Sequence, residues 1–248
     1  MDFMDSFGLL GFPLGHSFSK SYFTEKFKAE NIDAEFRNFE LDDITRMPLV
    51  IRETPELKGF AVTIPYKEKI MPFLDHISEE ARAIGAVNSV KVERTPSGFS
   101  LTGYNTDMPG FRDSLLRFMP HLPKQALILG TGGAAKAVKY ALTSLGISVT
   151  SVSRTPSAEE IGYPELVHQL DKYPLIINAT PLGTSPHTEG CPPIPYEQLT
   201  PDHYLFDLVY NPAVTTFMQR GMQHGAKARN GLEMLHLQAE YSWKIWNS

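Results

Sequence analysis

The sequence predicts a two-domain α/β protein in which one domain is built on a parallel sheet. Residues 126–223 alternate short apolar stretches with helical stretches, a pattern typical of right-handed βαβ units. The segment "GTGGAA" at residues 130–135 follows the first of these strands and has the form G-x-G-x-x-A, which is typical of dinucleotide-binding loops. A chain of 248 residues suits one large domain or two small ones, and about half of it precedes this loop.

The first half of the chain predicts strands and helices in a mixed order. Residues 19–32 are predicted as a helix because Tyr22, Phe23 and Phe27 are spaced for one helical face, whereas 34–41 alternates like a strand. The complete series is a strand at 6–12, a helix at 19–32, a strand at 34–41, a helical segment at 42–53 interrupted by Pro48, a strand at 58–65, short helices at 66–74 and 77–84, and two strands at 86–93 and 98–105 joined by a turn.

The second half predicts the alternation that a parallel sheet requires. A helix at 111–119 is followed by Pro120 and Pro123, which break the chain. This break and a point near residue 105 are equally good domain boundaries. The remaining elements are strands at 126–129, 147–152, 174–179 and 204–209, helices at 133–145, 164–170 and 213–223, and a closing amphipathic helix at 231–247.

Composition excludes several classes of protein. A net charge of −5 without basic runs argues against nucleic-acid binding, which depends on clustered Lys and Arg. Cys191 is the only cysteine, so an intramolecular disulfide is impossible and a cytoplasmic, reducing location is expected. The N-terminus lacks the basic region of a secretory signal, and no apolar run approaches the roughly 20 residues that span a bilayer, so no membrane contact is expected. The histidines show no metal-binding spacing, and no metal site is expected. Both a monomer and a homodimer remain open.

The glycine-rich loop and the end of the next strand predict a nucleotide site. Gly130 permits a tight turn and Gly132 permits a phosphate to approach the backbone. The next strand ends in Ser153-Arg154-Thr155, where an NAD-specific site usually carries a carboxylate. A guanidinium beside two hydroxyls suits a 2′-phosphate and favours NADP over NAD. The alternatives are a connection that binds no ligand and an arginine that is simply exposed.

Three polar clusters precede the loop, at junctions where α/β proteins commonly bind ligands. They are His16, Ser17 and Ser19 after the first strand, Thr63 and Lys67 after a later strand, and Asn105, Thr106 and Asp107 where the last strand of this half ends.

Lys67 is the most informative residue of these clusters. Pro65 favours a helix that begins there, which places Lys67 in a first turn where the helix dipole disfavours a positive charge. A neighbouring Asp would have the opposite effect, so that the lysine could exchange protons. The alternatives are a solvated surface lysine and, for Asp107, a helix N-cap.

Together these segments resemble the shikimate dehydrogenase family over nearly the whole chain. "GFPLGHSFS" is similar to the family's G-x-P-x-x-H-S-x-S, "AVTIPYK" to N-V-T-x-P-x-K, and "GAVNS" to G-A-V-N-T. "YNTD" is similar to D-N-T-D and "GTGGAA" to G-A-G-G-A, and "INAT", "DLVYNP" and "GLEMLHLQA" follow in the family's order.

The resemblance implies a substrate domain at 1–104 plus 232–248, a Rossmann-like NADP-binding domain at 105–231, and a cleft between them. It implies the reversible reduction of 3-dehydroshikimate to shikimate by NADPH, in the shikimate pathway of aromatic amino-acid biosynthesis. The cofactor carries the hydride, and the protein supplies orientation and a proton.

The resemblance also assigns individual residues. Lys67 would be the acid–base residue, and Asp107 would pair with it and hold a substrate hydroxyl. The substrate carboxylate would be bound by Ser17, Ser19 and Tyr210, and the ring hydroxyls by Thr63, Asn88 and Gln238. The pyrophosphate would be bound by Gly130, Thr131, Gly132, Gly133 and Ala134, the 2′-phosphate by Ser153, Arg154 and Thr155, and the nicotinamide would lie near Val209 and Gly231.

The sequence departs from the family's pattern at several positions. Ala61 replaces an Asn, Lys20 a Pro, Met108 a Gly, Ser153 an Asn and Glu233 a Gly, and no basic residue follows Thr155 closely. Two other hypotheses therefore stay open. One is an enzyme that prefers quinate or NAD, and the other is a ligand sensor that has kept the fold without turnover.

Overall fold

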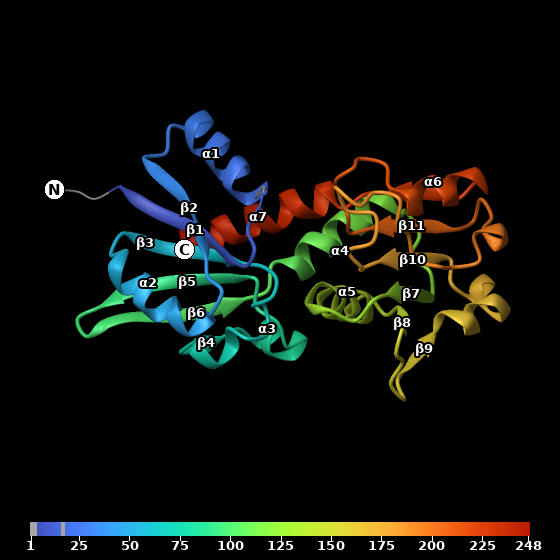
Figure 1. Ribbon diagram of the computed structural model, residues 1–248, viewed down its shortest axis with the longest axis horizontal. Helices are drawn as coiled ribbons and strands as arrows, with labels where there is room; N and C mark the ends of the chain where they lie inside the picture. Colours follow the sequence, from blue (N-terminus) through green and yellow to red (C-terminus); the bar gives the residue numbers. More distant parts are fainter. Residues whose placement is uncertain (1–3, 16–17) are drawn as a thin grey trace. The chain divides into compact units, whose positions relative to one another are not determined.

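The chain forms two compact units. The computed structural model describes residues 4–15 and 18–248 (Figure 1). Unit 1 comprises residues 1–106 and 239–248, and unit 2 comprises residues 107–238. The final helix α7 (Leu232–Trp246) therefore begins in unit 2 and ends in unit 1.

Unit 1 is built on a six-stranded mixed sheet in the order β2-β1-β3-β5-β6-β4. β1 pairs in parallel with β2 and β3, whereas β3, β5 and β6 pair antiparallel. Its elements are β1 (Asp5–Gly11), α1 (Phe18–Glu30), β2 (Ala34–Glu40), η1 (Ile44–Arg46), α2 (Met47–Glu53), β3 (Leu57–Val62), η2 (Met71–Phe73), β4 (His76–Ile77), α3 (Glu79–Ile84), β5 (Ser89–Thr95) and β6 (Gly98–Tyr104).

Alternate residues of each strand point to opposite faces of the first sheet. Both faces are covered by helices, and each face has its own core. One face packs with Met47 and Ile51 of α2, and the other packs with Phe23 and Phe27 of α1. Trp246, near the end of α7, belongs to the second of these cores and is 3% exposed. Its indole lies where a side chain at Gly59 would be, since a Cβ built there would lie 2.3 Å from Cδ1 of Trp246. Glycine at position 59 thus makes room for the tryptophan.

Unit 2 confirms the predicted parallel sheet. All six strands are parallel, in the order β9-β8-β7-β10-β11-β12, so that the order reverses between β7 and β10. This is the strand order of the dinucleotide-binding doubly wound fold. Its elements are α4 (Asp107–Phe118), β7 (Gln125–Leu129), α5 (Gly133–Ser144), β8 (Ser148–Ser153), β9 (Glu160–Gly162), η3 (Tyr163–His168), η4 (Leu170–Lys172), β10 (Leu175–Asn178), η5 (Tyr196–Gln198), β11 (Tyr204–Asp207), α6 (Thr216–Gln223) and β12 (Lys227–Arg229).

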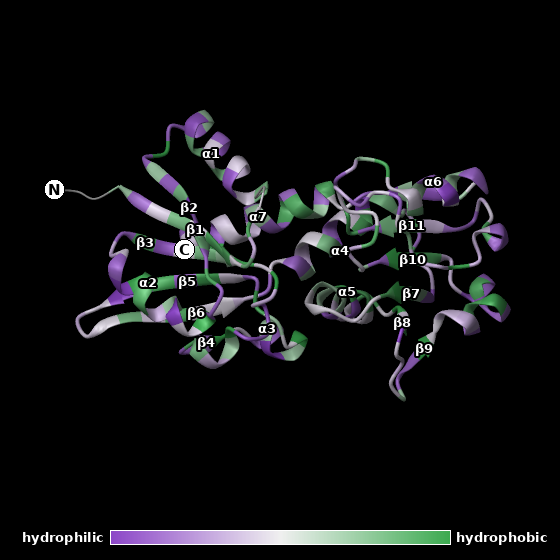
Figure 2. Ribbon diagram, viewed as in Figure 1, coloured by the Kyte–Doolittle hydropathy of each residue, from purple (hydrophilic) through white to green (hydrophobic). Residues whose placement is uncertain are grey.

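The central strands of unit 2 are apolar on both faces, as a sheet covered on both sides requires. Figure 2 shows β7 and β10 in the hydrophobic colour. Ala126 and Ile128 of β7 pack with α4 and α5, whereas Leu127 and Leu129 pack with Phe217 of α6.

Two predicted helices differ from the structure. The helix predicted at 66–74 is wrong, because residues 67–70 form turns and only Met71–Phe73 is a short 3-10 helix. Pro72 lacks an amide donor and disfavours helical geometry just before it, which leaves too few residues after Pro65 to sustain an α-helix. The helical segment predicted at 164–170 is formed by the 3-10 helices η3 and η4. The short strands β4, β9 and β12 were not predicted. In the part of the chain that the structure describes, none of the helices is long and apolar enough to cross a membrane.

Replacing Gly59 by Ala should destabilise the protein, because the new methyl group overlaps the buried indole of Trp246. We expect Gly59→Ala to lower the free energy of unfolding by about 1–3 kcal/mol in chemical denaturation. Gly190→Ala is the control, since a Cβ built at Gly190 meets its nearest atom at 3.5 Å, an ordinary contact. Equal stability of the two variants would show that Trp246 yields at little cost.

Candidate functional site

The carboxyl ends of β1 and β3 lie side by side in unit 1 and position Thr63. The Thr63 amide donates to the carbonyl of Leu10 at 2.9 Å, and the Phe12 amide donates to Ile64 at 3.1 Å. A Cβ built on Gly11 would lie 2.5 Å from Cγ2 of Thr63, so glycine is needed for this approach. The loop that leaves β1 therefore starts beside Thr63.

The serines predicted to bind the substrate follow this loop. Ser19 lies in the first turn of α1 and is half-buried. Ser17 lies outside the described residues.

The segment that carries Lys67 is a series of hydrogen-bonded turns. The amide of Tyr66 donates to Thr63 and the amide of Ile70 donates to Tyr66, both at 2.9 Å. The buried hydroxyl of Tyr66 donates to the carbonyl of Leu41 at 2.6 Å. Lys67 is half-buried, and its own carbonyl accepts from the Val87 amide at 2.7 Å. The backbone at Lys67 is thus held beside Asn88.

Asn88 connects the ends of two strands of unit 1 through both atoms of its carboxamide. Asn88 is 3% exposed, and its Oδ1 accepts from the amide of Thr106 at 2.6 Å while its Nδ2 donates to the Thr106 hydroxyl at 3.0 Å. The Thr106 hydroxyl also lies 3.1 Å from Oγ of Ser242 on α7. Asn88 is joined to β3 as well, because the amide of Val62 donates to its carbonyl at 2.8 Å. Thr63, Lys67 and Asn88 are therefore brought together at one end of the sheet.

Thr106 and Ser242 were not predicted as site residues. The sequence places Thr106 in a polar cluster but assigns it no role. Ser242 gives no local signal, since its partner is 136 residues away in the sequence.

Asp107 and Gln238 both belong to unit 2 and lie on two helices, α4 and α7, that pack closely. Asp107 is the first residue of α4 and is 6% exposed. One turn later on the same helical face, a Cβ built on Gly110 would lie 3.0 Å from the backbone nitrogen of Gln238. Gln238 is 8% exposed, and its Nε2 donates to the carbonyl of Leu235 at 2.9 Å. The absence of a side chain at Gly110 therefore sets the spacing of α4 and α7 near both residues.

The glycine-rich loop lies where the strand order of unit 2 reverses. Gly130 has φ of +108°, which favours glycine, and its amide donates to the carbonyl of Val152 at 2.9 Å. A Cβ built on it would lie 3.1 Å from the carbonyl oxygen of Ala179, directly after β10. In open α/β sheets this point of reversal is where ligands bind.

The helix that follows begins without side-chain capping. Gly132 is the N-cap of α5 and provides no side-chain hydrogen bond, and a Cβ built there has no neighbour within 4 Å. Thr131 is exposed, and Gly133 and Ala134 are half-buried in the first turn. Backbone N–H groups at such a helix start suit an anion such as a pyrophosphate.

The end of β8 carries an exposed cation. Arg154 directly follows β8 and is exposed, as is Thr155, whose amide donates to Oγ of Ser153 at 3.3 Å. Burial raises the pKa of Tyr163. Arg154 is close enough for its positive charge to act in the opposite direction and lower that pKa. Ser153, Arg154 and Thr155 thus follow the carboxyl end of β8, at the same end of the sheet as the Gly130 loop.

Val209 and Gly231 are adjacent at the carboxyl end of β11. The Gly231 amide donates to the carbonyl of Val209 at 3.1 Å, and a Cβ built on Gly231 would lie 2.3 Å from the carbonyl oxygen of Leu208. Only glycine fits there. Tyr210, which follows Val209 in the sequence, is half-buried, and burial raises the pKa of its hydroxyl.

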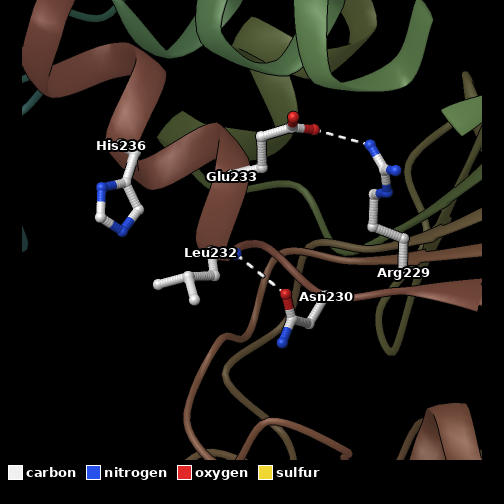
Figure 3. Close-up of a pocket in the computed structure, with 5 residues that line it drawn as sticks. All are labelled: Arg229, Asn230, Leu232, Glu233 and His236. Carbon is white, nitrogen blue, oxygen red and sulfur yellow. Dashed lines mark hydrogen bonds and ion pairs between the residues drawn. The ribbon is translucent and has the colours of Figure 1, made fainter. Parts of the chain in front are cut away.

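A groove of about 470 Å³ begins beside Gly231 (Figure 3). Glu233 turns its carboxylate toward Arg229, 2.6 Å away, and also accepts from Oγ of Ser114 at 2.7 Å and from Arg117 at 3.1 Å. Burial alone would raise the pKa of Glu233, but these hydrogen bonds and the charge of Arg229 lower it below its usual range. The groove is lined by Arg229, Asn230, Leu232, Glu233 and His236.

A buried carboxyl group that was not predicted as a site residue binds the backbone of Val209. Asp207, at the end of β11, is 0% exposed and accepts from Asn178 Nδ2 at 2.9 Å, from the Val209 amide at 3.0 Å and from Thr215 Oγ1 at 2.5 Å. Burial raises its pKa to about 6, although the three hydrogen bonds act in the opposite direction. Asn178 also holds the start of the next loop, since its Oδ1 accepts from the amide of Thr180 at 3.0 Å.

Comparison with known proteins relates this geometry to one family. A family model described as the shikimate dehydrogenase substrate binding domain matches residues 9–90. A shikimate dehydrogenase (NADP(+)) of Carboxydothermus hydrogenoformans is 36% identical over 257 residues, which cover 96% of this chain and 90% of the relative.

Solved structures agree with the sequence comparison. A shikimate dehydrogenase in complex with NADP+ has a TM-score of 0.87 and 32% identity, over 98% of this chain and 90% of its own. Shikimate 5-dehydrogenase from Thermus thermophilus, in complex with NADP(H) and shikimate, has a TM-score of 0.83 and 30% identity, over 98% of this chain and 93% of its own.

The raised pKa of Asp207 predicts a pH-dependent stability. Between about pH 4 and pH 6 the native protein holds a proton on Asp207 that the unfolded chain has released, since the pKa rises from 3.8 to about 6 on folding. The free energy of unfolding contributed by this group is therefore highest below pH 4 and falls as the pH rises through 6, by about 3 kcal/mol.

Chemical denaturation of the wild type and of Asp207→Asn between pH 4 and pH 7 checks this, because the amide does not titrate. The stability of the wild type relative to the variant should decrease across that window. Parallel curves would mean that Asp207 titrates at its ordinary value.

Proposed function

The chain belongs to the shikimate dehydrogenase family, and we propose that it catalyses the reversible, NADP-dependent reduction of 3-dehydroshikimate to shikimate. This makes it an oxidoreductase of the shikimate pathway, which leads to aromatic amino acids. The observation that carries the proposal is the similarity, over 98% of the chain, to an enzyme solved with NADP(H) and shikimate.

The residues of unit 2 fit NADP. Gly130 leaves space that a Cβ would fill, and α5 starts at Gly132 with no side-chain cap, which supports pyrophosphate binding by Gly130, Thr131, Gly132, Gly133 and Ala134. The exposed guanidinium of Arg154, between the hydroxyls of Ser153 and Thr155, supports binding of the 2′-phosphate. The adjacency of Val209 and Gly231 supports a nicotinamide site at the end of β11.

Lys67 and Asp107 are the proposed catalytic residues. When bound, NADPH supplies the hydride that adds to C3 of 3-dehydroshikimate. The electron pair of the C3 carbonyl then moves to its oxygen, which takes a proton from Nζ of Lys67, and the amine of Lys67 takes that proton back in the reverse reaction. Asp107 is proposed to hold a substrate hydroxyl. The anchored turn at Tyr66 supports the role of Lys67, because it fixes the backbone from which this side chain extends.

The remaining polar residues are proposed to orient the substrate. Its carboxylate would be bound by Ser17, Ser19 and Tyr210, and its ring hydroxyls by Thr63, Asn88 and Gln238. Unit 1 is the proposed substrate domain, which the family match at residues 9–90 supports, and unit 2 is the proposed cofactor domain. The single cysteine supports the proposal of a cytoplasmic location.

The function and the role of Lys67 can be tested together. Reduced-nicotinamide absorbance should rise when the wild-type protein is mixed with shikimate and NADP+. The rise should be smaller when quinate replaces shikimate or when NAD+ replaces NADP+. Lys67→Met should lower kcat by about 10²–10⁴-fold, because the C3 hydroxyl of shikimate must then lose its proton to solvent. Shikimate binding, measured by calorimetry, should be largely kept.

Glu68→Gln is the matched control, since Glu68 is the exposed neighbour of Lys67 on the same turn. A wild type that binds NADP+ and shikimate without turnover would instead identify a ligand sensor.

Arg154 should decide the choice between the two nicotinamide cofactors. Arg154→Ser removes the proposed charge-assisted hydrogen bonds to the 2′-phosphate, and we expect KM for NADP+ to rise about 10- to 100-fold while KM for NAD+ stays nearly constant. Lys172→Ser, which removes an exposed charge from η4, is the control. Equal effects on both cofactors would place the 2′-phosphate elsewhere.

A further inference from the structure

Asp207 is a fully buried acid, and none of the ion pairs formed within residues 4–15 and 18–248 involves it. Its three hydrogen-bond donors, Asn178, the Val209 amide and Thr215, are all neutral. Neutral donors stabilise a carboxylate, but they leave its net charge in place. At pH 8, above the value of about 6 to which burial raises its pKa, Asp207 carries a buried negative charge.

These donors connect the carboxylate to the end of the sheet where the nicotinamide is proposed to bind. Asn178 ends β10, Val209 follows β11, and Thr215 is the N-cap of α6 (Figure 1). The carbonyl of Val209 in turn accepts the amide of Gly231. One carboxylate thus fixes the backbone of Val209 and contributes its charge at the same place.

We propose that Asp207 is a positioning residue whose buried charge makes the site bind oxidised cofactor, NADP+, more tightly than NADPH. This inference rests on the proposed function, because it takes the nicotinamide to lie near Val209. The physical reason is the difference in charge between the two rings. The oxidised nicotinamide ring carries one positive charge and the reduced ring carries none, whereas the phosphates are the same in both. A fixed negative charge therefore stabilises one form only, and more strongly inside the protein than in water.

The readout is the ratio of two dissociation constants, Kd of NADPH divided by Kd of NADP+, measured by calorimetry in the absence of substrate. Asp207→Asn removes the charge and keeps the shape, and its carboxamide can still accept from Asn178 and Val209 while donating to Thr215. We expect this ratio to fall about four- to fifteenfold at pH 8, the effect of one charge at roughly 10–20 Å through an effective dielectric constant of about 20.

Asp202→Asn is the matched control. Asp202 is exposed just before the amino end of β11, so its substitution changes the net charge equally at the opposite end of the same strand. The ratio should stay at the wild-type value. A variant that only loosened the fold would weaken both cofactor forms alike and would leave the ratio unchanged.

A second measurement covers the case in which Asp207→Asn does not fold. Lowering the pH from 8 to 5.5 protonates Asp207 in part of the native protein, and bound NADP+ opposes this protonation, so the same ratio should fall about two- to threefold. His236 lines the nearby groove and His187 lies in the loop bound to Thr216, and histidines change charge in this range, so the titration is done in the double variant His236→Gln, His187→Gln. The 2′-phosphate is common to both cofactors, and its protonation cancels in the ratio.

The other groups near Asp207 do not account for such a change. Burial raises the pKa of Tyr196 well above neutrality, and the carboxylate of Glu233 titrates below its usual range. Arginines stay charged throughout. The charged and titratable groups on the elements that adjoin Asp207 include Lys227 and Arg229 on β12, the latter with its partner Glu233, and Tyr204 on β11. Arg220 on α6 lies beside Tyr196 and Cys191, and His187 lies in the loop whose Thr188 carbonyl accepts from Thr216.

The outcomes separate this inference from the proposed function. If the wild type oxidises shikimate with NADP+ while the ratio is the same in Asp207→Asn, or is flat between pH 8 and pH 5.5, the inference is wrong and the function stands. If the wild type binds neither cofactor form, both are wrong. A ratio that falls in Asp207→Asn but also in Asp202→Asn would mean that overall charge, and not Asp207, sets the preference.

Discussion

In each unit one buried side-chain amide joins the ends of two strands at the end of the sheet where the candidate site residues lie. Strands diverge there into loops, and every polar group that leaves the ladder without water needs another partner. Asn88 in unit 1 uses both carboxamide atoms on Thr106, and Asn178 in unit 2 donates to Asp207 while it accepts from Thr180. In both units a planar group with a donor and an acceptor joins two strand ends. The loops that carry the candidate site residues start from these joints.

The fold could be predicted largely from local signals, whereas the partners of the site residues could not. The alternation of apolar and helical stretches predicted the parallel strands of unit 2. The glycine-rich loop at Gly130 predicted a ligand site, and it lies where the strand order reverses, in a conformation that favours glycine. The helix predicted around Lys67 was wrong because Pro65 favours a helix start there, whereas Pro72, only seven residues later, ends the segment before an α-helix can form. β12 was missed because three residues of edge strand carry no periodic pattern.

The buried contacts around the candidate site have no signature in the sequence. Thr106 and Ser242 meet across 136 residues, and Asp207 binds Asn178 across 29. Three departures from the family's pattern are accommodated by contacts of this kind. Glu233 binds Arg229 and Arg117. Met108 packs on the core that contains α4 and α5, and Ala61 lies in the core that contains Trp246. These compensations become visible only when distant segments are brought together.

The position of Trp246 has a consequence for synthesis of the chain. The indole that fills the space above Gly59 belongs to Trp246, which lies after the last residue of unit 2 in the sequence. A ribosome therefore completes all of unit 2 before it delivers the residue that closes one core of unit 1. Until then Phe7, Phe23 and Phe36 lack the indole that they contact in the finished protein. Synthesis of unit 1 therefore starts first, and this aromatic core is completed only after unit 2 has been made.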